Sequence, residues 1–225
     1  MLSKAQEKYI RSLHTKKGRS KHGRCLVEGQ KLIDAAEGLI DYTFTSEETH
    51  NFDKLVTTTT PQSIAAVART PEFTLEDVLA YRTVLILDGV QDPGNVGSIF
   101  RLCQGFEAGL ILVESADPTN PKTLRSSAGA IFHTPWASLE RPEAEELLAK
   151  QDRAVFRLEK REKSQDISLI TSKDTIYLIA GSEGSGIQLN TKGASVVVPH
   201  NSLLESMNVG NAVAIALFSR FIAKE

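Results

Sequence analysis

The residues best suited to chemistry lie in three separate stretches, each of which follows an apolar run. They are Asn95 and Arg101 in the first stretch, Glu183 in the second, and Ser206 and Asn208 in the third. A guanidinium can bind an anionic group through two parallel hydrogen bonds and can stabilise negative charge that develops during a reaction. Taken singly, each stretch has a plainer interpretation, because helical arginines usually face solvent and short polar residues often cap helices. Only convergence of the three stretches at one place favours a functional site.

The first stretch is predicted to join a strand to a helix. Residues 83–87 form a continuous apolar run, which is typical of a strand buried on both faces of a parallel sheet. Pro93 and Gly94 then predict a turn, and Asn95 is predicted to cap the helix that follows. An apolar stripe repeats at helical spacing through Val96, Ile99, Phe100, Cys103 and Phe106. Arg101 lies almost opposite this stripe, so we expect its side chain to be exposed.

The other two stretches also follow predicted strands. Residues 181–187 come after the strand 176–180, and their glycines would let backbone groups approach a ligand closely. They match neither a phosphate-binding P-loop nor the dinucleotide fingerprint. Residues 200–209 come after the strand 195–198 and lead into an apolar helix. Because open parallel sheets bind ligands at the carboxyl ends of their strands, we expect all three stretches to line one crevice.

The order of the predicted elements indicates an α/β protein. Residues 1–75 would form a small α/β domain, and residues 76–225 a largely parallel sheet covered by helices. The boundary falls in the polar, proline-containing stretch 69–76. In the first domain we predict helices at 3–13, at 29–39 and from Thr60, and strands at 25–27, 42–44 and 55–57. In the second we predict further strands at 110–113 and 154–157, and helices at 142–150 and 205–223.

Composition points to a globular protein without a membrane span. The chain has 225 residues, of which 41% are hydrophobic and 24% charged. It contains no apolar run near the ~20 residues that a transmembrane helix needs, and its first residues lack the apolar block of a secretory signal. We therefore expect a cytoplasmic protein. Cys25 and Cys103 support no disulfide framework, and with His22 they make too weak a ligand set for us to predict a metal site.

Positive charge is concentrated at one end of the chain. The net charge is −2, yet residues 1–31 hold nine Lys or Arg against two acidic residues. Residues 15–24 are basic, polar and punctuated by glycine, which predicts a mobile loop. Its candidate contacts with a polyanion are Lys16, Lys17, Arg19, Lys21 and Arg24. On charge alone, a phosphate-binding arm and a solvated tail are equally good interpretations.

Several ordered motifs resemble those of the SpoU/TrmH family of RNA ribose 2'-O-methyltransferases, in the SPOUT superfamily. They read Asn95-x-Gly97-x-x-x-Arg101, Gly181-Ser182-Glu183-Gly184-x-Gly186-Ile187, and Val198-Pro199 leading to Ser206-Met207-Asn208-Val209. The segments Val27-Glu28-Gly29-x-Lys31-Leu32 and Thr60-Pro61-Gln62-x-Ile64-Ala65-Ala66-Val67 are similar to the family's ribosomal-protein-like RNA-binding domain. The resemblance covers nearly the whole chain.

The resemblance implies S-adenosylmethionine as methyl donor, a deep trefoil knot in the C-terminal third, and a homodimer. It implies that the cofactor is held by Ala180, Gly181, Ser182, Gly184, Gly186, Ile187, Val198, Pro199, Ser206, Met207 and Asn208. It also implies RNA as the partner, while composition and cysteine usage predict neither a membrane partner nor a metal. Nothing in the spacing of apolar residues indicates the knot.

The same resemblance suggests catalytic roles for five polar residues, Asn95, Arg101, Glu183, Ser206 and Asn208. Arg101 would bind a phosphate of the RNA and stabilise developing alkoxide charge, although a guanidinium, which stays protonated in proteins, is a doubtful base. Asn95 would orient Arg101 or the ribose, and Glu183 would anchor that network. Ser206 and Asn208 would shape the cofactor and hydroxyl site. Ser127 has two open interpretations, a supporting RNA contact and a plain helix start.

Ribosomal RNA is the expected substrate, because the N-terminal domain resembles a ribosomal RNA binder. Two alternatives remain open at this point. Transfer RNA would change the target without changing the chemistry, whereas a catalytically silent RNA-binding or assembly factor would keep the fold and lose the reaction. The presence of all five polar residues, Asn95, Arg101, Glu183, Ser206 and Asn208, favours the enzyme.

Overall fold

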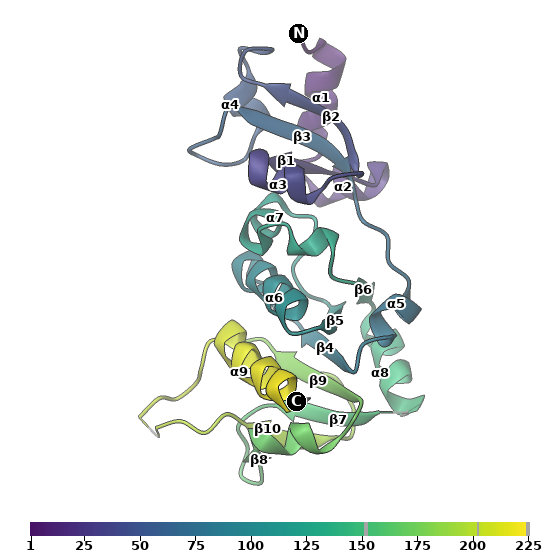
Figure 1. The fold of residues 1–225 in the computed structure, drawn as a ribbon, viewed down its shortest axis with the longest axis vertical. Coiled ribbons are helices and arrows are strands. Elements are labelled where there is room, and N and C mark those ends of the chain that lie inside the picture. The colour runs from purple at the N-terminus through teal and green to yellow at the C-terminus, as the bar shows by residue number, and fades with distance from the viewer. Residues whose placement is uncertain (151–152, 202, 224–225) are drawn as a thin grey trace.

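The computed structural model describes residues 1–150, 153–201 and 203–223. Figure 1 shows an elongated molecule in which an N-terminal unit is stacked on a larger C-terminal unit. Residues 70–74 have neither helical nor strand structure and connect the two. This connection lies within the stretch where the sequence places the domain boundary. Ser202 of the third polar stretch, and the last two residues of the predicted second domain, lie outside the described residues.

The N-terminal unit is built on an antiparallel sheet with the strand order β1-β3-β2. Its elements are α1 (Lys4–Ser12), α2 (Lys16–His22), β1 (Arg24–Glu28), α3 (Gln30–Ala35), β2 (Ile40–Thr45), α4 (Phe52–Leu55) and β3 (Ile64–Arg69). The predicted first helix is confirmed, and Ser3 caps it in a capping box with Gln6. Ile10 and Leu13 bury the apolar side of this region against Phe44 and Leu55.

One strand and one helix predicted in the N-terminal unit are wrong. Residues 55–57 are not a strand, because Leu55 ends α4. The helix predicted from Thr60 is instead β3, which begins at Ile64 and lies between β1 and β2. Its residues 65–68 are wholly buried. Pairing on both edges therefore outweighs the helical propensity of the alanines, which is a weak preference that tertiary contacts often override.

The basic segment 15–24 is not a mobile loop. Residues 16–22 form α2, which Thr15 caps by accepting a hydrogen bond from the amide of Gly18. The side chain of Arg19 is only 3% exposed. It donates hydrogen bonds to the main-chain oxygens of Leu13 and His14, to the hydroxyl of Thr119 and to the carboxylate of Asp117. The prediction that Arg19 contacts RNA is therefore corrected, because its donors are already used inside the protein.

The C-terminal unit is a parallel sheet with the strand order β6-β5-β4-β9-β7-β10-β8. Its strands are β4 (Thr83–Asp88), β5 (Ala108–Val113), β6 (Trp136–Leu139), β7 (Ala154–Leu158), β8 (Gln165–Asp166), β9 (Ile176–Gly181) and β10 (Ala194–Val197). Its helices are α5 (Leu75–Leu79), α6 (Pro93–Gly105), α7 (Pro121–Ser127), α8 (Arg141–Lys150) and α9 (Val209–Ile222), with 3₁₀ helices at Ala130–Phe132 and Ile167–Ser172. The predicted parallel α/β architecture is confirmed.

Alternate residues of the central strand β4 face two different helix layers. Leu85 and Leu87 belong to the core cluster beneath α6 and α9, whereas Val84 and Ile86 pack with the cluster of α5 and α8. Figure 1 shows α6 and α9 together on one side of the sheet. Gly97 lets α6 approach α7 closely, since a Cβ there would lie 2.6 Å from the Cβ of Ser126. Burial on both faces explains why β4 is a continuous apolar run.

Side chains from both units lock the N-terminal unit onto the C-terminal one. Besides the ion pair of Arg19 and Asp117, Arg125 of α7 donates to the hydroxyl of Thr57 at 2.7 Å and pairs with Glu28 at 3.3 Å. Apolar residues of α3 join the core cluster of the C-terminal unit. The two units are thus held together by buried charge as well as by apolar contact.

Replacing Arg19 is expected to destabilise the whole chain. Arg19→Ala leaves the mostly buried carboxylate of Asp117 without its cation, and removing one partner of such a pair typically costs about 3–5 kcal/mol. Urea unfolding followed by circular dichroism measures this loss. The exposed neighbour Lys17→Ala serves as the control and should change the free energy of unfolding by less than about 0.5 kcal/mol. An Arg19→Ala protein as stable as this control would contradict the structural role.

Candidate active site

The helix that carries Asn95 and Arg101 is capped by Asp92. A carboxylate oxygen of Asp92 accepts a hydrogen bond from the amide of Asn95 at 2.9 Å, and Pro93 occupies the first helical position. The prediction that Asn95 is the cap is therefore wrong. The hydrogen bond from this amide lowers the pKa of Asp92, assisted by nearby Lys122. Because Asp92 does the capping, the side chain of Asn95 is free to take part in other contacts.

One side chain joins the three predicted polar stretches. The amide nitrogen Nδ2 of Asn208 donates to Oδ1 of Asn95 at 3.1 Å and to Oε1 of Glu183 at 2.8 Å. Its oxygen Oδ1 accepts hydrogen bonds from the main-chain amides of Gly210 and Asn211 and so caps α9. This cap is why α9 begins at Val209 rather than at residue 205 as predicted. The expected convergence of the three stretches is what the structure contains.

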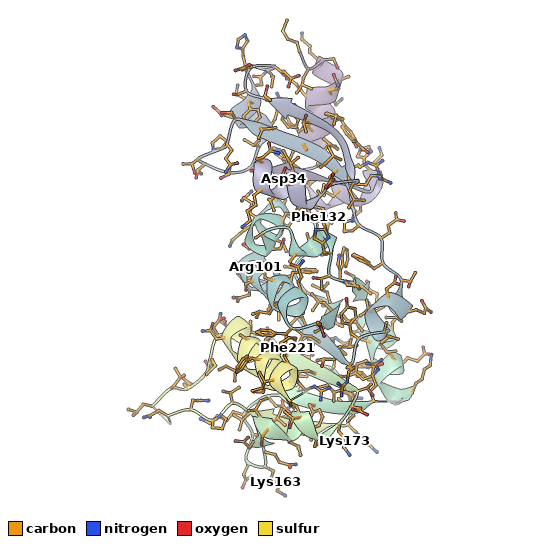
Figure 2. All side chains as sticks on the ribbon, in the orientation of Figure 1. Asp34, Arg101, Phe132, Lys163, Lys173 and Phe221 are labelled. Carbon is orange, nitrogen blue, oxygen red and sulfur yellow. The ribbon has the colours of Figure 1, made fainter. Side chains whose placement is uncertain are left out.

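Two of the predicted catalytic residues lie outside this hydrogen-bond network. The side chain of Arg101 is exposed, as its position opposite the apolar stripe predicts, and Figure 2 shows it on the outer side of α6. It forms no ion pair with the residues that the structure describes. Ser206 is also exposed and lies on the wall of a neighbouring cavity. Both side chains are therefore accessible to a ligand.

The cavity beside the network has a volume of about 460 Å³. Its walls include most of the predicted cofactor residues: Ala180, Gly181, Ser182, Gly184, Gly186, Ile187, Val198, Ser206 and Met207. Pro199 and Asn208 are not part of the wall. The side chain of Asn208 instead makes the hydrogen bonds to Asn95 and Glu183. A volume of this size is within the usual range for small-molecule sites.

Glycine makes the shape of the loop 181–187 possible. Ser182 and Gly186 form an isolated antiparallel bridge that closes the loop on itself. A Cβ on Gly181 would lie 2.2 Å from the main-chain carbon of Gly186, which no side chain permits. Gly186 itself has a φ of 65°, in the left-handed region that favours glycine. The loop therefore lines the cavity largely with backbone.

A charged cluster that the sequence did not predict lies on the cavity wall at the end of β7. Glu159 accepts a hydrogen bond from the hydroxyl of Ser195 at 2.6 Å. It also forms ion pairs with Arg157 at 2.9 Å and with Arg161 at 3.0 Å. Burial raises the pKa of Glu159, but these hydrogen bonds and positive charges outweigh burial and lower it overall. The available signal was a run of charged residues directly after a predicted strand, at the same edge of the sheet.

The predicted RNA contacts separate into exposed and internal residues. Lys16, Lys17 and Lys21 are exposed on α2, whereas Arg24 is half-buried and paired with Asp41. Ser127 is fully buried, and its hydroxyl donates to the main-chain oxygen of Leu124 at 2.8 Å. The prediction of an RNA contact through Ser127 is therefore corrected, because the helix-terminal hydrogen bond leaves it inside the protein.

Among the described residues, no cluster of three or more His, Cys, Asp or Glu side chains has the arrangement of a metal site. None of the helices in the described ranges is long and apolar enough to cross a membrane.

Comparisons with known proteins agree with the motifs. Residues 82–218 match the model of the SpoU rRNA Methylase family, and residues 4–43 match the MRM3-like substrate binding domain. The chain is 32% identical to the 23S rRNA (guanosine(2553)-2'-O)-methyltransferase RlmP of Bacillus subtilis, over 92% of each chain. The N-terminal match supports a substrate-binding unit.

Solved structures give the same result. A putative RNA methyltransferase of the TrmH family from Porphyromonas gingivalis superposes with a TM-score of 0.83 at 28% identity, over 98% of both chains. An AdoMet-bound rRNA methyltransferase from Sinorhizobium meliloti superposes with a TM-score of 0.83 at 25% identity, over 98% of this chain and 95% of the other. The resemblance in the motifs is thereby confirmed, and the chain belongs to the SpoU rRNA methylase family.

Proposed function

We propose that this protein transfers a methyl group from S-adenosylmethionine to a ribose 2'-hydroxyl of ribosomal RNA. The observation that carries this proposal is the contact of Asn208 with both Asn95 and Glu183 beside the 460 Å³ cavity. Membership of the SpoU family and the 2'-O-methylation of 23S rRNA by the Bacillus subtilis relative support it. Transfer RNA as substrate and a silent RNA-binding factor are less well supported, because the full-length relative acts on ribosomal RNA and the polar network is complete.

The cavity is suited to S-adenosylmethionine. The glycines at 181, 184 and 186 leave backbone amide and carbonyl groups of the loop open to a ligand, and Val198 and Met207 add apolar surface. The AdoMet-bound relative from Sinorhizobium meliloti supports the same cofactor here. When bound, S-adenosylmethionine supplies a sulfonium methyl group, which is already a reactive electrophile. The protein has to orient the ribose hydroxyl and assist the loss of its proton.

Each polar side chain then has a distinct role. Arg101, exposed on α6, binds a phosphate of the RNA and stabilises the alkoxide charge that develops on the ribose oxygen. The bonds from Asn208 hold Glu183 and Asn95 in a fixed orientation toward the ribose. Ser206, on the cavity wall, shapes the site where the cofactor and the ribose hydroxyl meet. The guanidinium of Arg101 is not the base, because an arginine side chain in a protein has no proton vacancy at neutral pH with which to accept one.

We propose the N-terminal residues 1–75 as the RNA-binding domain and residues 76–225 as the methyltransferase domain. The substrate-binding match at residues 4–43 supports the first assignment. Exposed Lys16, Lys17 and Lys21, with Arg24, would contact RNA phosphates. A ribosomal RNA substrate also supports a cytoplasmic location.

The deep trefoil knot and the homodimer belong to the same proposal. The order of β9, β7 and β10 in the sheet, with α9 returning to pack on α6, supports a knot in the C-terminal third. The exposed apolar side chains Ile215, Phe218 and Ile222 on α9 support an interface with a second copy. In such a dimer, Arg101 would serve either its own site or that of the partner.

Loss of Arg101 is expected to separate catalysis from cofactor binding. Arg101→Ala should lower kcat for methyl transfer to total rRNA by at least about 100-fold, the usual effect of losing one charge-stabilising donor. Its affinity for S-adenosylmethionine in calorimetry should stay within twofold of the wild type, since Arg101 is not part of the cavity wall. The exposed neighbour Gln104→Ala on the same helix is the control. Normal turnover by Arg101→Ala would overturn the assignment.

Reversing the charge of α2 is expected to weaken RNA binding alone. The double variant Lys17→Glu/Lys21→Glu should bind rRNA fragments about tenfold more weakly and flatten the dependence of affinity on salt by roughly two counterions. Lys150→Glu/Lys173→Glu is a control of equal net charge at exposed positions on the C-terminal unit. Filter binding at several salt concentrations measures both. Equal losses of RNA affinity in the two variants would show that the net charge of the protein, and not the position of the lysines on α2, determines RNA binding.

A further inference from the structure

A buried carboxylate lies next to the cavity without being part of its wall. Asp88 is the last residue of the central strand β4, and its side chain is 0% exposed. The residue pairs in register with Gly181, the last residue of β9. It is thus located where the loop 181–187, which we call the cofactor loop, leaves the sheet. A charged group that is buried this deeply needs several strong partners to remain in place.

Asp88 contacts both ends of the cofactor loop. Its main-chain oxygen accepts a hydrogen bond from the amide of Ser182, at 3.1 Å, where the loop begins. Its carboxylate oxygen Oδ2 accepts two more, from the amide of Gln188 at 2.5 Å and from that of Leu189 at 2.7 Å, where the loop ends. Hydrogen bonds to an ionised acceptor are about twice as strong as neutral ones. One residue therefore closes the loop across its base.

A cation from another element holds the carboxylate itself. Nη1 of Arg141, at the start of α8, lies 3.0 Å from Oδ1 of Asp88. A second guanidinium nitrogen of Arg141 pairs with Glu114 at the end of β5. The carboxylate of Asp88 is therefore oriented from one side by α8 while it binds the loop amides on the other. This arrangement resists rotation of the side chain, because Oδ2 accepts the two loop amides and Oδ1 is held by the ion pair with Arg141.

We infer that Asp88 is a positioning residue that sets the shape of the cofactor loop, and through it the place of Glu183. The inference rests on the proposed function of the cavity. Asp88 is not part of the cavity wall, but the loop it closes supplies one part of that wall. The same loop carries the carboxylate that accepts the hydrogen bond from Asn208. A loosened loop base would disturb cofactor binding first and the polar network second.

Two substitutions separate the acceptor role from simple loss of volume. Asp88→Ala removes the acceptor for both amides, whereas Asp88→Asn keeps one oxygen that can accept them. Asp77→Ala is the matched control, because this carboxylate also accepts a main-chain amide but caps the distant helix α5. Hydrogen exchange of the Gln188 and Leu189 amides reports on the loop base directly. Calorimetry with S-adenosylmethionine and the KM values for cofactor and RNA report on its consequence.

The expected pattern is specific to a loop anchor. Asp88→Ala should speed exchange at Gln188 and Leu189 at least tenfold and raise the KM for S-adenosylmethionine at least tenfold, with the KM for RNA unchanged. Asp88→Asn keeps one acceptor for the amides but turns an NH2 group toward Arg141, so both values should change clearly less than in Asp88→Ala. Unchanged exchange and cofactor affinity in Asp88→Ala would overturn the inference, as would an Asp88→Asn protein that behaves like Asp88→Ala.

The wild-type protein provides a test that needs no variant. If Asp88→Ala does not fold, exchange of the Gln188 and Leu189 amides in the wild type still decides the matter. Rates close to those of an unstructured peptide overturn the inference, and strong protection at both amides supports it. A wild-type protein that shows protected amides but fails to bind S-adenosylmethionine would instead refute the proposed function, so the two failures can be told apart.

Discussion

The two hydrogen bonds donated by the side chain of Asn208 hold the candidate site together. Asn95, Glu183 and Asn208 come from the segments that follow β4, β9 and β10, and none of the three is near another in sequence. A parallel sheet brings the carboxyl ends of its strands to one edge, which makes such a meeting possible. The amide group then makes it specific, because it donates to two loops while its oxygen caps the helix of the third.

The cavity and the RNA-binding unit are positioned by charge as much as by apolar burial. The loop 181–187 is closed by Asp88, and Glu159 with its two arginines holds another part of the cavity wall. At the junction of the two units, Arg19 and Arg125 pair with Asp117 and Glu28. In each case a poorly exposed carboxylate has several partners, which is the condition under which buried charge is tolerated.

Sequence patterns predicted the parallel sheet well because its strands are buried on both faces. The run at residues 83–87 is such a strand, and the family motifs identified the three loops. Patterns failed where a distant partner decides the structure. Arg19 pairs with Asp117, which lies about a hundred residues away in the chain. Nothing within residues 15–24 indicates that partner, so their composition alone predicts a mobile loop. The cap of α6 was also misassigned, although a proline at the first helical position points to Asp92.

Asn208 both caps α9 and donates hydrogen bonds to Asn95 and Glu183, and these two roles restrict which residue types can occupy position 208. As helix caps, asparagine, aspartate and serine are about equally good. Aspartate, however, would place a second negative charge at the 2.8 Å now spanned by a hydrogen bond to Glu183. Serine has one hydroxyl proton and cannot donate to Asn95 and Glu183 while it accepts from α9. The position therefore selects for a neutral group with two donors and an acceptor, a requirement that helix capping alone does not impose.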